Sequence, residues 1–317
     1  MAENSSIEWT HHTFNPWRGC SKVHAGCTNC YAEKNQGVAM QGITWGEVWQ
    51  GGQRVVKAES GWREPLKWAR DAARAGERRR VFCASLADLL EVPETPVSWP
   101  SGWGVKERNS AIARLDHARA DLDTARERLW DVIRETARMP LPLVDDDLER
   151  EGGTLAIPPT PGLDWLLLTK RPENWRLVPE DTRPFCWLGT SISDQKTADE
   201  WAWRLCQAQG FRLRFLSIEP LTGFVDLWAF RSLINWVIVG GESGPKARPC
   251  DVEWVRDIVR QCRKAGVPCF VKQLGAITRW DLDAPMPPNG LLTDRKGGDM
   301  SEWPEDLRVR EFPEVQS

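Results

Sequence analysis

The sequence lacks the features that mark membrane-spanning, exported and strongly basic proteins. Its longest apolar runs, 165–168 and 236–239, are far shorter than the about 20 residues needed to cross a bilayer, so we expect no membrane partner. The first residues carry neither a basic region nor an apolar stretch, so we expect no signal peptide and a cytoplasmic protein. The 42 lysines and arginines nearly balance 45 aspartates and glutamates, and a net charge of −3 gives no support to non-specific coating of nucleic acid.

Tyrosine is also scarce, with one residue in 317, whereas tryptophan is abundant, with 19 residues. Hydrophobic residues make up 41% of the chain, which is enough to build a packed core and excludes wholesale disorder. The length is compatible with about two domains of average size or with one α/β barrel.

Short apolar segments alternate with amphipathic helical segments along most of the chain. The apolar segments lack polar alternation, as expected of parallel strands that are covered on both faces. Asp251 and Gly266 are placed to begin and end one helix, and Gly76 and Gly210 are placed to end two others. This alternation is typical of right-handed βαβ units and predicts an α/β fold with a parallel sheet or barrel. The predicted strands are 7–13, 80–85, 165–169, 187–191, 213–218, 236–240 and 269–272, and the predicted helices are 64–75, about 107–139, 197–209 and 252–265.

Two regions interrupt this rhythm. Residues 93–162 hold a stretch rich in proline, serine and tryptophan, a long charged helix and a loop, and we interpret them as an insertion. Only the latter part of that helix is expected to serve as the crossover between two strands. Residues 276–317 are rich in proline, glycine and acids and show no core pattern, so we expect an irregular, loosely packed C-terminal extension. The predicted organisation is one barrel-like domain, 1–275, followed by this extension.

The nine cysteines are unevenly distributed. Six lie singly in apolar segments, as is typical of buried, unreactive thiols. The other three form a C-x6-C-x2-C cluster on a polar loop, and the absence of an export signal favours metal or redox use over disulfides. With His24 they could close a Cys3His zinc site, and without it three thiolates could hold an iron–sulfur cube with one open iron. A thioredoxin-like role for the C-x2-C pair lacks the helix context of that motif. The clustered cysteines are Cys20, Cys27 and Cys30, and the scattered ones are Cys83, Cys186, Cys206, Cys250, Cys262 and Cys269.

Several further segments accompany the cysteine cluster, which lies in residues 15–33. They are SLADLL (85–90), LLLTKRPEN (166–174), WLGTSISDQ (187–195), FLSIEPL (215–221), NWVIVGGESGPKARP (235–249) and FVKQLG (270–275). On these segments the chain resembles a phage and bacterial family known as three-Cys-motif proteins, which is related to the radical S-adenosylmethionine (SAM) superfamily. The resemblance covers most of residues 5–275 and leaves out the insertion and the extension.

The resemblance implies a partial (β/α)6-type radical SAM barrel with a [4Fe-4S] cluster at its mouth, held by Cys20, Cys27 and Cys30. SAM would bind the open iron, and one electron from an external donor would cleave it to methionine and a 5′-deoxyadenosyl radical that removes a substrate hydrogen. The chain departs from the superfamily pattern in two ways. The first gap has six residues instead of three, and Asn29 replaces the aromatic residue before the third cysteine, with Tyr31 after it. The resemblance places Asn29 and Tyr31 beside the adenine of SAM.

Polar residues gather where the predicted strands end, which is where parallel α/β folds place their reactive groups. Lys170, Glu242 and Lys272 are our candidates for catalysis, although the two lysines could also be ordinary surface cations. The paired glycines Gly240 and Gly241 would let the backbone approach SAM closely or would simply form a tight turn. A carboxylate at position 219 would bind the ribose or amino group of SAM or merely pair with Lys170 or Arg171. The candidates for SAM binding are Ser85, Asp88, Thr190, Ser191, Glu219, Gly240 and Gly241.

Evidence on the substrate comes from the segment 54–80, which is rich in arginine and lysine and has tryptophans within it and just before it. Such a combination suits nucleic-acid backbones and unstacked bases, but an amphipathic helix with a solvated basic face explains the same pattern. Together with the phage context, it favours a radical SAM enzyme that modifies or rearranges a nucleic-acid base or nucleotide, with isomerisation of a modified thymine as a specific hypothesis. The alternatives are a non-catalytic Cys3His zinc module that acts through a protein partner, and a metal-dependent hydrolase that uses Asp88, Glu219 and Glu242. The tryptophans are Trp45, Trp49, Trp62 and Trp68.

Overall fold

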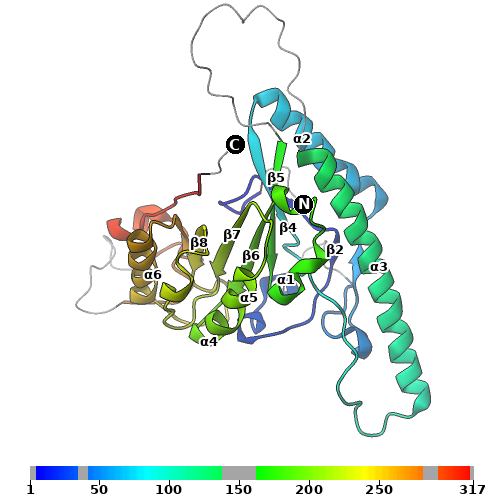
Figure 1. The fold of residues 1–317 in the computed structure, drawn as a ribbon. Coiled ribbons are helices and arrows are strands. Elements are labelled where there is room, and N and C mark those ends of the chain that lie inside the picture. Colours follow the sequence, from blue (N-terminus) through cyan, green and yellow to red (C-terminus); the bar gives the residue numbers. More distant parts are fainter. Residues whose placement is uncertain (1–4, 35–41, 138–161, 281–291, 315–317) are drawn as a thin grey trace, which may run out of the picture.

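Seven parallel strands form the central sheet of the protein. The computed structural model describes residues 5–34, 42–137, 162–280 and 292–314. The order of the strands across the sheet is the order in which they occur in the chain (Figure 1). A doubly wound sheet reverses its strand order at one point. The strand order here does not reverse, so the sheet is wound in one direction, and it curls into a half-barrel. The strands are β1 (His12–Phe14), β4 (Arg78–Cys83), β5 (Gly162–Thr169), β6 (Cys186–Ile192), β7 (Leu213–Ile218), β8 (Trp236–Gly240) and β10 (Cys269–Gln273).

The prediction of a parallel α/β sheet is confirmed. Strands β7 and β8 have the predicted bounds, and β4, β5, β6 and β10 overlap the predicted segments. The first strand is shorter than predicted, because residues before His12 form turns in which Thr10 Oγ1 donates to Arg80 O at 2.9 Å. The remaining described strands form two small sheets of two strands each. Strand β2 (Trp17–Arg18) pairs with β3 (Val55–Val56), and β9 (Cys250–Asp251) pairs with β11 (Thr278–Arg279).

The helices also follow the predicted signals. Asp251 accepts a hydrogen bond from Glu253 N at 2.9 Å at the start of the predicted helix, and Gly266 ends it with a φ of 66°. The predicted helix 197–209 is divided into two α-helical pieces joined by a π turn at 198–202. The last two residues of the predicted helix 107–139 lie outside the described residues. The helices are α1 (Tyr31–Lys34), α2 (Glu64–Ala75), α3 (Val105–Ala137), α4 (Gln195–Thr197), α5 (Trp203–Cys206) and α6 (Val252–Ala265).

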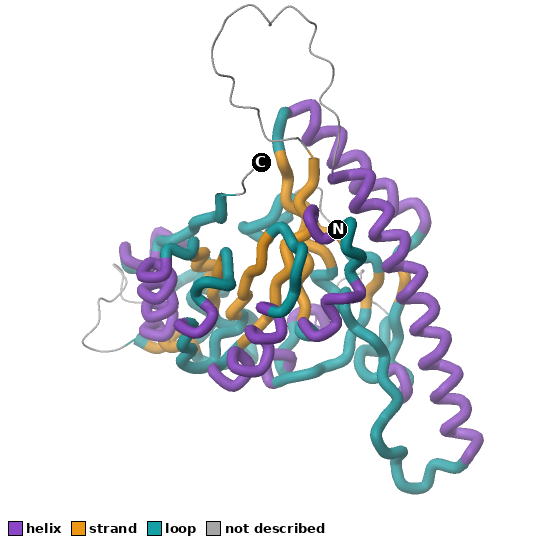
Figure 2. The backbone as a smooth tube through the Cα atoms, viewed as in Figure 1, coloured by secondary structure: helices purple, strands orange, loops and turns teal. Residues whose placement is uncertain are grey.

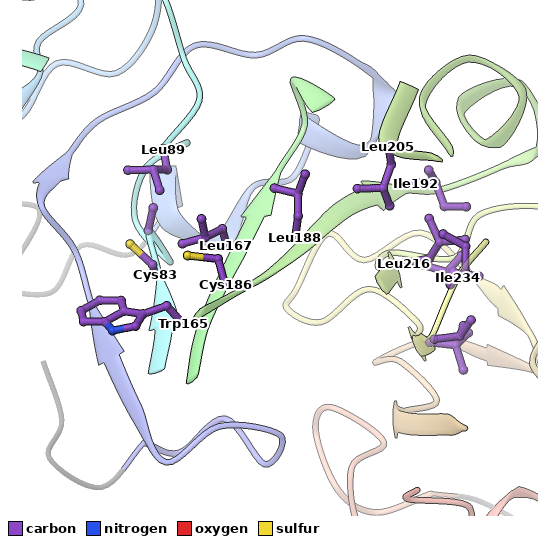
Figure 3. Packing of buried hydrophobic residues seen from close by; sticks show 14 of the residues in the cluster. Cys83, Leu89, Trp165, Leu167, Cys186, Leu188, Ile192, Leu205, Leu216 and Ile234 are labelled. Carbon is purple, nitrogen blue, oxygen red and sulfur yellow. The ribbon is translucent and has the colours of Figure 1, made fainter. Parts of the chain in front are cut away.

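The outer face of the sheet is buried beneath the helices. Successive residues of a strand point to opposite faces, and most of the outward set is apolar. Figure 3 shows part of this layer, in which Cys83 and Trp165 of the first strands lie near Cys186 and Leu188 of β6. The prediction of buried, unpaired thiols is confirmed for five of the scattered cysteines, and Cys206 is half-buried.

The inner face of the half-barrel is filled with aromatic rings toward the beginning of β6, β7, β8 and β10. Trp187 and Trp236 meet edge to face, with ring centroids 6.0 Å apart, and both are almost completely buried. The ring of Phe215 lies over Gly189, where a Cβ would come within 2.4 Å of it. This aromatic layer therefore fills the inner face toward the beginning of these strands with apolar side chains.

The C-terminal extension packs more tightly than the sequence predicts. Val271 N donates to Val309 O at 2.8 Å, and residues 309–311 run along the free edge of β10. Trp303 and Leu307 are fully buried. The expectation of loose packing was therefore wrong for residues 292–314, because single apolar side chains can anchor an irregular segment without any periodic pattern.

Helix α3 runs beside the sheet, and its two halves have different surroundings (Figure 2). In its second half, Leu129 and Ile133 belong to the main core. In its first half, Leu115 and Ala118 pack against a short 3₁₀ helix, Val48–Gln50, and most other side chains are exposed. This division agrees with the expectation that only the latter part serves as a crossover. Among the described residues, no helix has the length and apolar character that crossing a membrane requires.

Candidate functional site

Polar side chains replace apolar ones on the inner face where the strands end. In β7, the buried ring of Phe215 is followed on the same face by Ser217 and then, just past the strand, by Glu219. The same alternation places polar side chains at the ends of β5, β6 and β10. We call this inner polar set the mouth. It consists of Lys170, Ser191, Ser217, Glu219 and Lys272.

The two lysines of the mouth have different partners. Lys272 Nζ lies 2.8 Å from Glu219 Oε1, and Ser217 Oγ donates to Glu219 Oε2 at 3.0 Å. Lys170 Nζ donates to Ser191 Oγ at 3.2 Å and pairs with no carboxylate in the described part of the chain. The mouth therefore contains one ion pair and one cation that is not neutralised, a balance that suits a ligand with a carboxylate or phosphate group.

Gly240 ends β8 and Gly241 follows it, at a point where the chain passes closely against the end of β10. A Cβ at Gly240 would lie 3.1 Å from Gln273 O and 3.4 Å from Glu219 Oε1, and a Cβ at Gly241 would lie 2.3 Å from Leu274 O. The close approach of these two chain segments therefore explains both glycines without any cofactor.

The three clustered cysteines lie on a loop that is attached to the carboxyl end of the sheet. The backbone N–H groups of Cys27 and Cys30 each close a turn on the residue three positions earlier, at 2.9 and 3.3 Å. Cys27 is buried, Cys20 and Cys30 are half-buried, and all three thiols are free. Tyr31 OH donates to Ser85 O at 2.6 Å, which fastens the end of the loop to the segment that follows β4.

A buried network of charges lies directly beneath the first cysteine. Glu91 is 1% exposed and accepts hydrogen bonds from Arg54 Nε at 2.7 Å, from Arg171 Nη2 at 3.3 Å and from Ser21 Oγ at 2.6 Å. Arg171 Nη1 lies 3.8 Å from Cys20 Sγ. Burial and the nearby Glu91 carboxylate raise the pKa of the Cys20 thiol above its ordinary value, and Arg171 opposes this shift.

Asp88 belongs to this buried network and does not line the mouth. Its carboxylate accepts from Thr169 Oγ1 at 2.6 Å, from Lys170 N at 2.9 Å and from Arg171 Nη1 at 2.9 Å. Although burial opposes ionisation, Arg171 and these hydrogen bonds lower the pKa of Asp88 below its ordinary value. Because its oxygens are occupied by protein donors, Asp88 is placed to hold the ends of β4 and β5 together.

Glu242 ties the cysteine loop to the segment that follows β8. Its carboxylate accepts from Arg248 N at 2.8 Å, from Arg248 Nε at 3.0 Å and from Arg248 Nη2 at 2.9 Å. Asn29 Nδ2 donates to Glu242 Oε2 at 3.1 Å, and Arg248 Nη1 donates to Ala25 O at 3.0 Å. Although burial opposes ionisation, these bonds lower the pKa of Glu242. We call Asn29, Glu242 and Arg248 the loop bridge.

The loop bridge leads to a prediction about the accessibility of Cys27. Hydrogen bonds to charged groups contribute about 1.5–3 kcal/mol, which corresponds to about a ten- to hundredfold change in an opening equilibrium. We therefore expect Arg248→Ala to increase the rate at which Cys27 is alkylated in the native protein by about that factor, as measured by mass spectrometry of the Cys27 peptide. Arg260→Ala on the surface of α6 is the matched control. An unchanged Cys27 rate in Arg248→Ala would show that the bridge does not hold the loop.

His24 is held in the cysteine loop as a neutral imidazole. Gly26 N donates to His24 Nδ1 at 2.7 Å, and the His24 ring packs on Trp201 with ring centroids 4.2 Å apart. Burial and the nearby Lys170 lower the pKa of His24 to about 3. Since Nδ1 accepts a hydrogen bond, the proton of the neutral ring lies on Nε2, which is buried without a hydrogen-bond partner in the described structure. This arrangement disfavours His24 as a metal ligand, because neither nitrogen offers a free lone pair.

The described residues contain no group of three or more His, Cys, Asp or Glu side chains positioned to hold a metal ion. The chemistry of the cysteine loop nevertheless fits a set of three thiolate ligands, because three free thiols share one short loop at the carboxyl end of the sheet. Arg171 beside Cys20 provides a positive charge of the kind that such thiolates require.

The remaining predicted ligands lie away from the mouth or beside it. Thr190 is on the outer, helix-covered face, where its Oγ1 donates to Thr169 O at 3.0 Å. Ser85 Oγ accepts from Asn15 Nδ2 at 3.0 Å, next to β1. Among the residues that sequence reasoning missed, only Glu91 carries a signal, since a carboxylate directly after the apolar SLADLL segment has to be paired if it is buried. The missed residues are Ser21, Arg54, Glu91 and Arg248.

The two tryptophans within the basic segment 54–80 are not available to stack on bases. Trp62 and Trp68 are each 3% exposed, and Trp68 stacks on a histidine of β1. Arg54 and Arg78 form ion pairs that are largely shielded from solvent. Helix α2 is amphipathic, as the alternative interpretation expects, and its basic side chains remain exposed, so nucleic-acid binding by this segment stays a prediction.

The fold and the site together define an α/β half-barrel protein with a three-cysteine loop attached to its carboxyl end. The chain belongs to the family described as "Protein of unknown function (DUF5131)", which matches residues 4–101 and 153–300. The stretch between the two matched parts contains all of α3 and lies within the predicted insertion. No curated protein and no solved structure matches the chain.

Proposed function

We propose that the protein is a radical SAM enzyme that acts at the mouth of the half-barrel. The observation that carries this proposal is the position of the C-x6-C-x2-C loop, whose three thiols are free and which is bonded to the segments that follow β4, β5 and β8. The carboxyl end of a parallel barrel is where catalytic groups gather. Three thiolates leave one iron of a [4Fe-4S] cluster without a protein ligand, and an open iron is where SAM would chelate.

The ligands of the cluster in this proposal are Cys20, Cys27 and Cys30. When bound, such a cluster supplies one electron, received from an external donor, to SAM, whose S–C5′ bond breaks to give methionine and a 5′-deoxyadenosyl radical. Arg171, held in place by Glu91, lies beside the first thiol and offsets part of the negative charge of the ligand set. The loop bridge holds the part of the loop that carries the other two thiols, through Asn29 and Ala25 O.

The mouth offers groups of both signs for the amino-acid end of SAM. In this proposal Lys170 binds the carboxylate, and Glu219 accepts hydrogen bonds from the ammonium group. Lys272 Nζ lies 2.8 Å from Glu219 Oε1 and orients this carboxylate. Glu242, by contrast, acts as a positioning residue through the loop bridge and not as a catalytic one.

The substrate that we propose is a nucleic-acid base or nucleotide, with isomerisation of a modified thymine as the specific reaction to test. Two observations support this class. The chain resembles a phage and bacterial family on the motifs that form the site, and the unpaired cation of the mouth suits a phosphate as well as a carboxylate.

The structure gives less support to the two other functions that the sequence left open. A closed Cys3His zinc site depends on His24, whose Nδ1 accepts from Gly26 N and whose Nε2 therefore carries the ring proton. A metal-dependent hydrolase depends on Asp88, Glu219 and Glu242, and each of these carboxylates already faces an arginine or a lysine. These carboxylates are therefore paired with protein cations in the described structure.

The proposal is tested by anaerobic reconstitution of the purified protein with iron and sulfide. We expect about four irons and four sulfides per chain, a brown colour, and 5′-deoxyadenosine in the presence of SAM and dithionite but not when either is left out. Protein that stays free of iron after reconstitution, or that binds one zinc per chain instead, would contradict the proposal.

A further inference from the structure

Three tryptophans from two separate segments converge beside the first half of α3. Trp49 comes from the 3₁₀ helix Val48–Gln50, and Trp99 and Trp103 come from the loop that leads into α3. Trp99 and Trp103 stack with ring centroids 5.7 Å apart, and Trp49 meets them edge to face at 6.2 and 5.8 Å. All three are half-buried, so each keeps part of its indole surface in contact with solvent. We call them the Trp cluster.

Two exposed arginines of α3 are fixed against the Trp cluster. Arg108 Nε donates to Trp103 O at 3.1 Å, and Arg114 Nη2 donates to Trp49 O at 2.8 Å. Neither arginine pairs with a carboxylate in the described part of the chain. The other arginines of this helix do so: Arg119 pairs with Asp116, Arg126 with Asp123, Arg128 with Glu59 and Arg134 with Asp131.

The surroundings of the cluster add to its positive potential. It lies near the N-terminal end of α3, where the helix dipole is positive, and Lys106 contributes a further cation in the first turn. Cations at a helix N-terminus are unfavourable by themselves, and Glu107 is the acidic residue of that turn. The arrangement would be stabilised by an anionic ligand.

We propose that the Trp cluster with Arg108 and Arg114 is a binding surface for single-stranded nucleic acid. Unstacked bases would stack on the indoles, and the two guanidinium groups would bind phosphates. The surface is connected to the candidate active site, because Gly46, three residues before Trp49, donates its N–H to Cys20 O at 3.1 Å. Its role as a substrate-binding surface rests on the proposed function. The binding of nucleic acid itself requires neither the iron–sulfur cluster nor SAM.

The test is fluorescence anisotropy of a labelled 12-nucleotide single strand with the full chain. We expect Trp103→Ala to weaken binding by about five- to a hundredfold, as for the loss of one base-stacking aromatic residue. We expect Arg108→Ala combined with Arg114→Ala to lower the slope of log K against log salt by about 1.4, because two phosphate contacts are lost. The matched controls are Trp228→Ala and Arg134→Ala, which remove an exposed tryptophan and an exposed arginine elsewhere.

Several results would overturn this proposal. They are no measurable binding by the unmodified protein, equal binding of a duplex, or equal losses in the control variants. Thermal melting of each variant shows whether it is folded, and the arginine variants test the surface without disturbing the packed indoles. An iron-free protein that binds the strand would contradict only the enzymatic proposal, and an iron-loaded, SAM-cleaving protein that does not bind it would contradict only this one.

Discussion

Replacement of Glu91 by alanine is expected to lower the free energy of unfolding by about 3–5 kcal/mol, the usual cost of removing one partner from a buried ion pair. Glu91 is 1% exposed and is the shared acceptor of Arg54 and Arg171, whose side chains are 1% and 10% exposed. Without it, two guanidinium groups stay buried next to each other with much less compensating charge. The loss is measured by urea unfolding monitored by circular dichroism.

Two further variants make this experiment decisive. Glu59→Ala removes the partner of Arg128 in an exposed ion pair, so its effect on stability is expected to be small. Glu91→Gln keeps the shape of the side chain but removes the charge, and we expect it to fall between the unmodified protein and Glu91→Ala. If Glu91→Ala is no less stable than Glu59→Ala, the buried network does not support the cysteine loop as described.

Replacement of Cys27 by serine is expected to prevent reconstitution of the cluster and to reduce 5′-deoxyadenosine formation to the level of iron-free protein. Cys27 is the buried member of the triad, and two thiolates do not hold a cube that needs three. Because serine differs from cysteine by one atom and Cys27 belongs to none of the hydrophobic core clusters, the variant is expected to remain folded. The measurements are iron content, visible absorption and product yield under anaerobic conditions.

The controls for this prediction separate a cluster from zinc and from general damage. Cys206→Ser changes a half-buried thiol on α5 and is expected to keep full iron content. His24→Ala tests the zinc alternative, because a Cys3His site would lose its metal as completely as with Cys27→Ser. A Cys27→Ser protein that binds iron and cleaves SAM like the unmodified chain would contradict the assigned ligands.

The strands and helices were largely predictable because local signals specify them. Gly76 and Gly266 both adopt positive φ and end α2 and α6 where the sequence places the ends. A continuous apolar run gave β8 its bounds, as is typical of a strand that is covered on both faces. The polar residues at the strand ends, including those of the mouth, were predicted as a set because polar side chains mark the points where the apolar strands end.

The roles of the individual polar residues at the strand ends were not predictable, because these roles depend on partners that are distant in the chain. Asn29 donates to Glu242, 213 residues further along the chain, and Arg54 donates to Glu91, 37 residues further along. No spacing in the sequence records such pairs. Likewise, the sequence alone does not show whether Trp62 is buried or lies on a basic, aromatic surface. The packing of α2 decides between the two.

The pairing of residues 309–311 with β10 has a consequence for the way the chain acquires its structure. An unpaired strand edge is a template for joining another chain, and here the segment that covers the edge is synthesised after every strand of the sheet. A nascent chain that has completed β10 is therefore exposed to intermolecular association until the covering segment leaves the ribosome. Loss of that segment by proteolysis would recreate the same hazard in the finished protein, so removal of residues 309–314 should lead to aggregates that are detectable by light scattering.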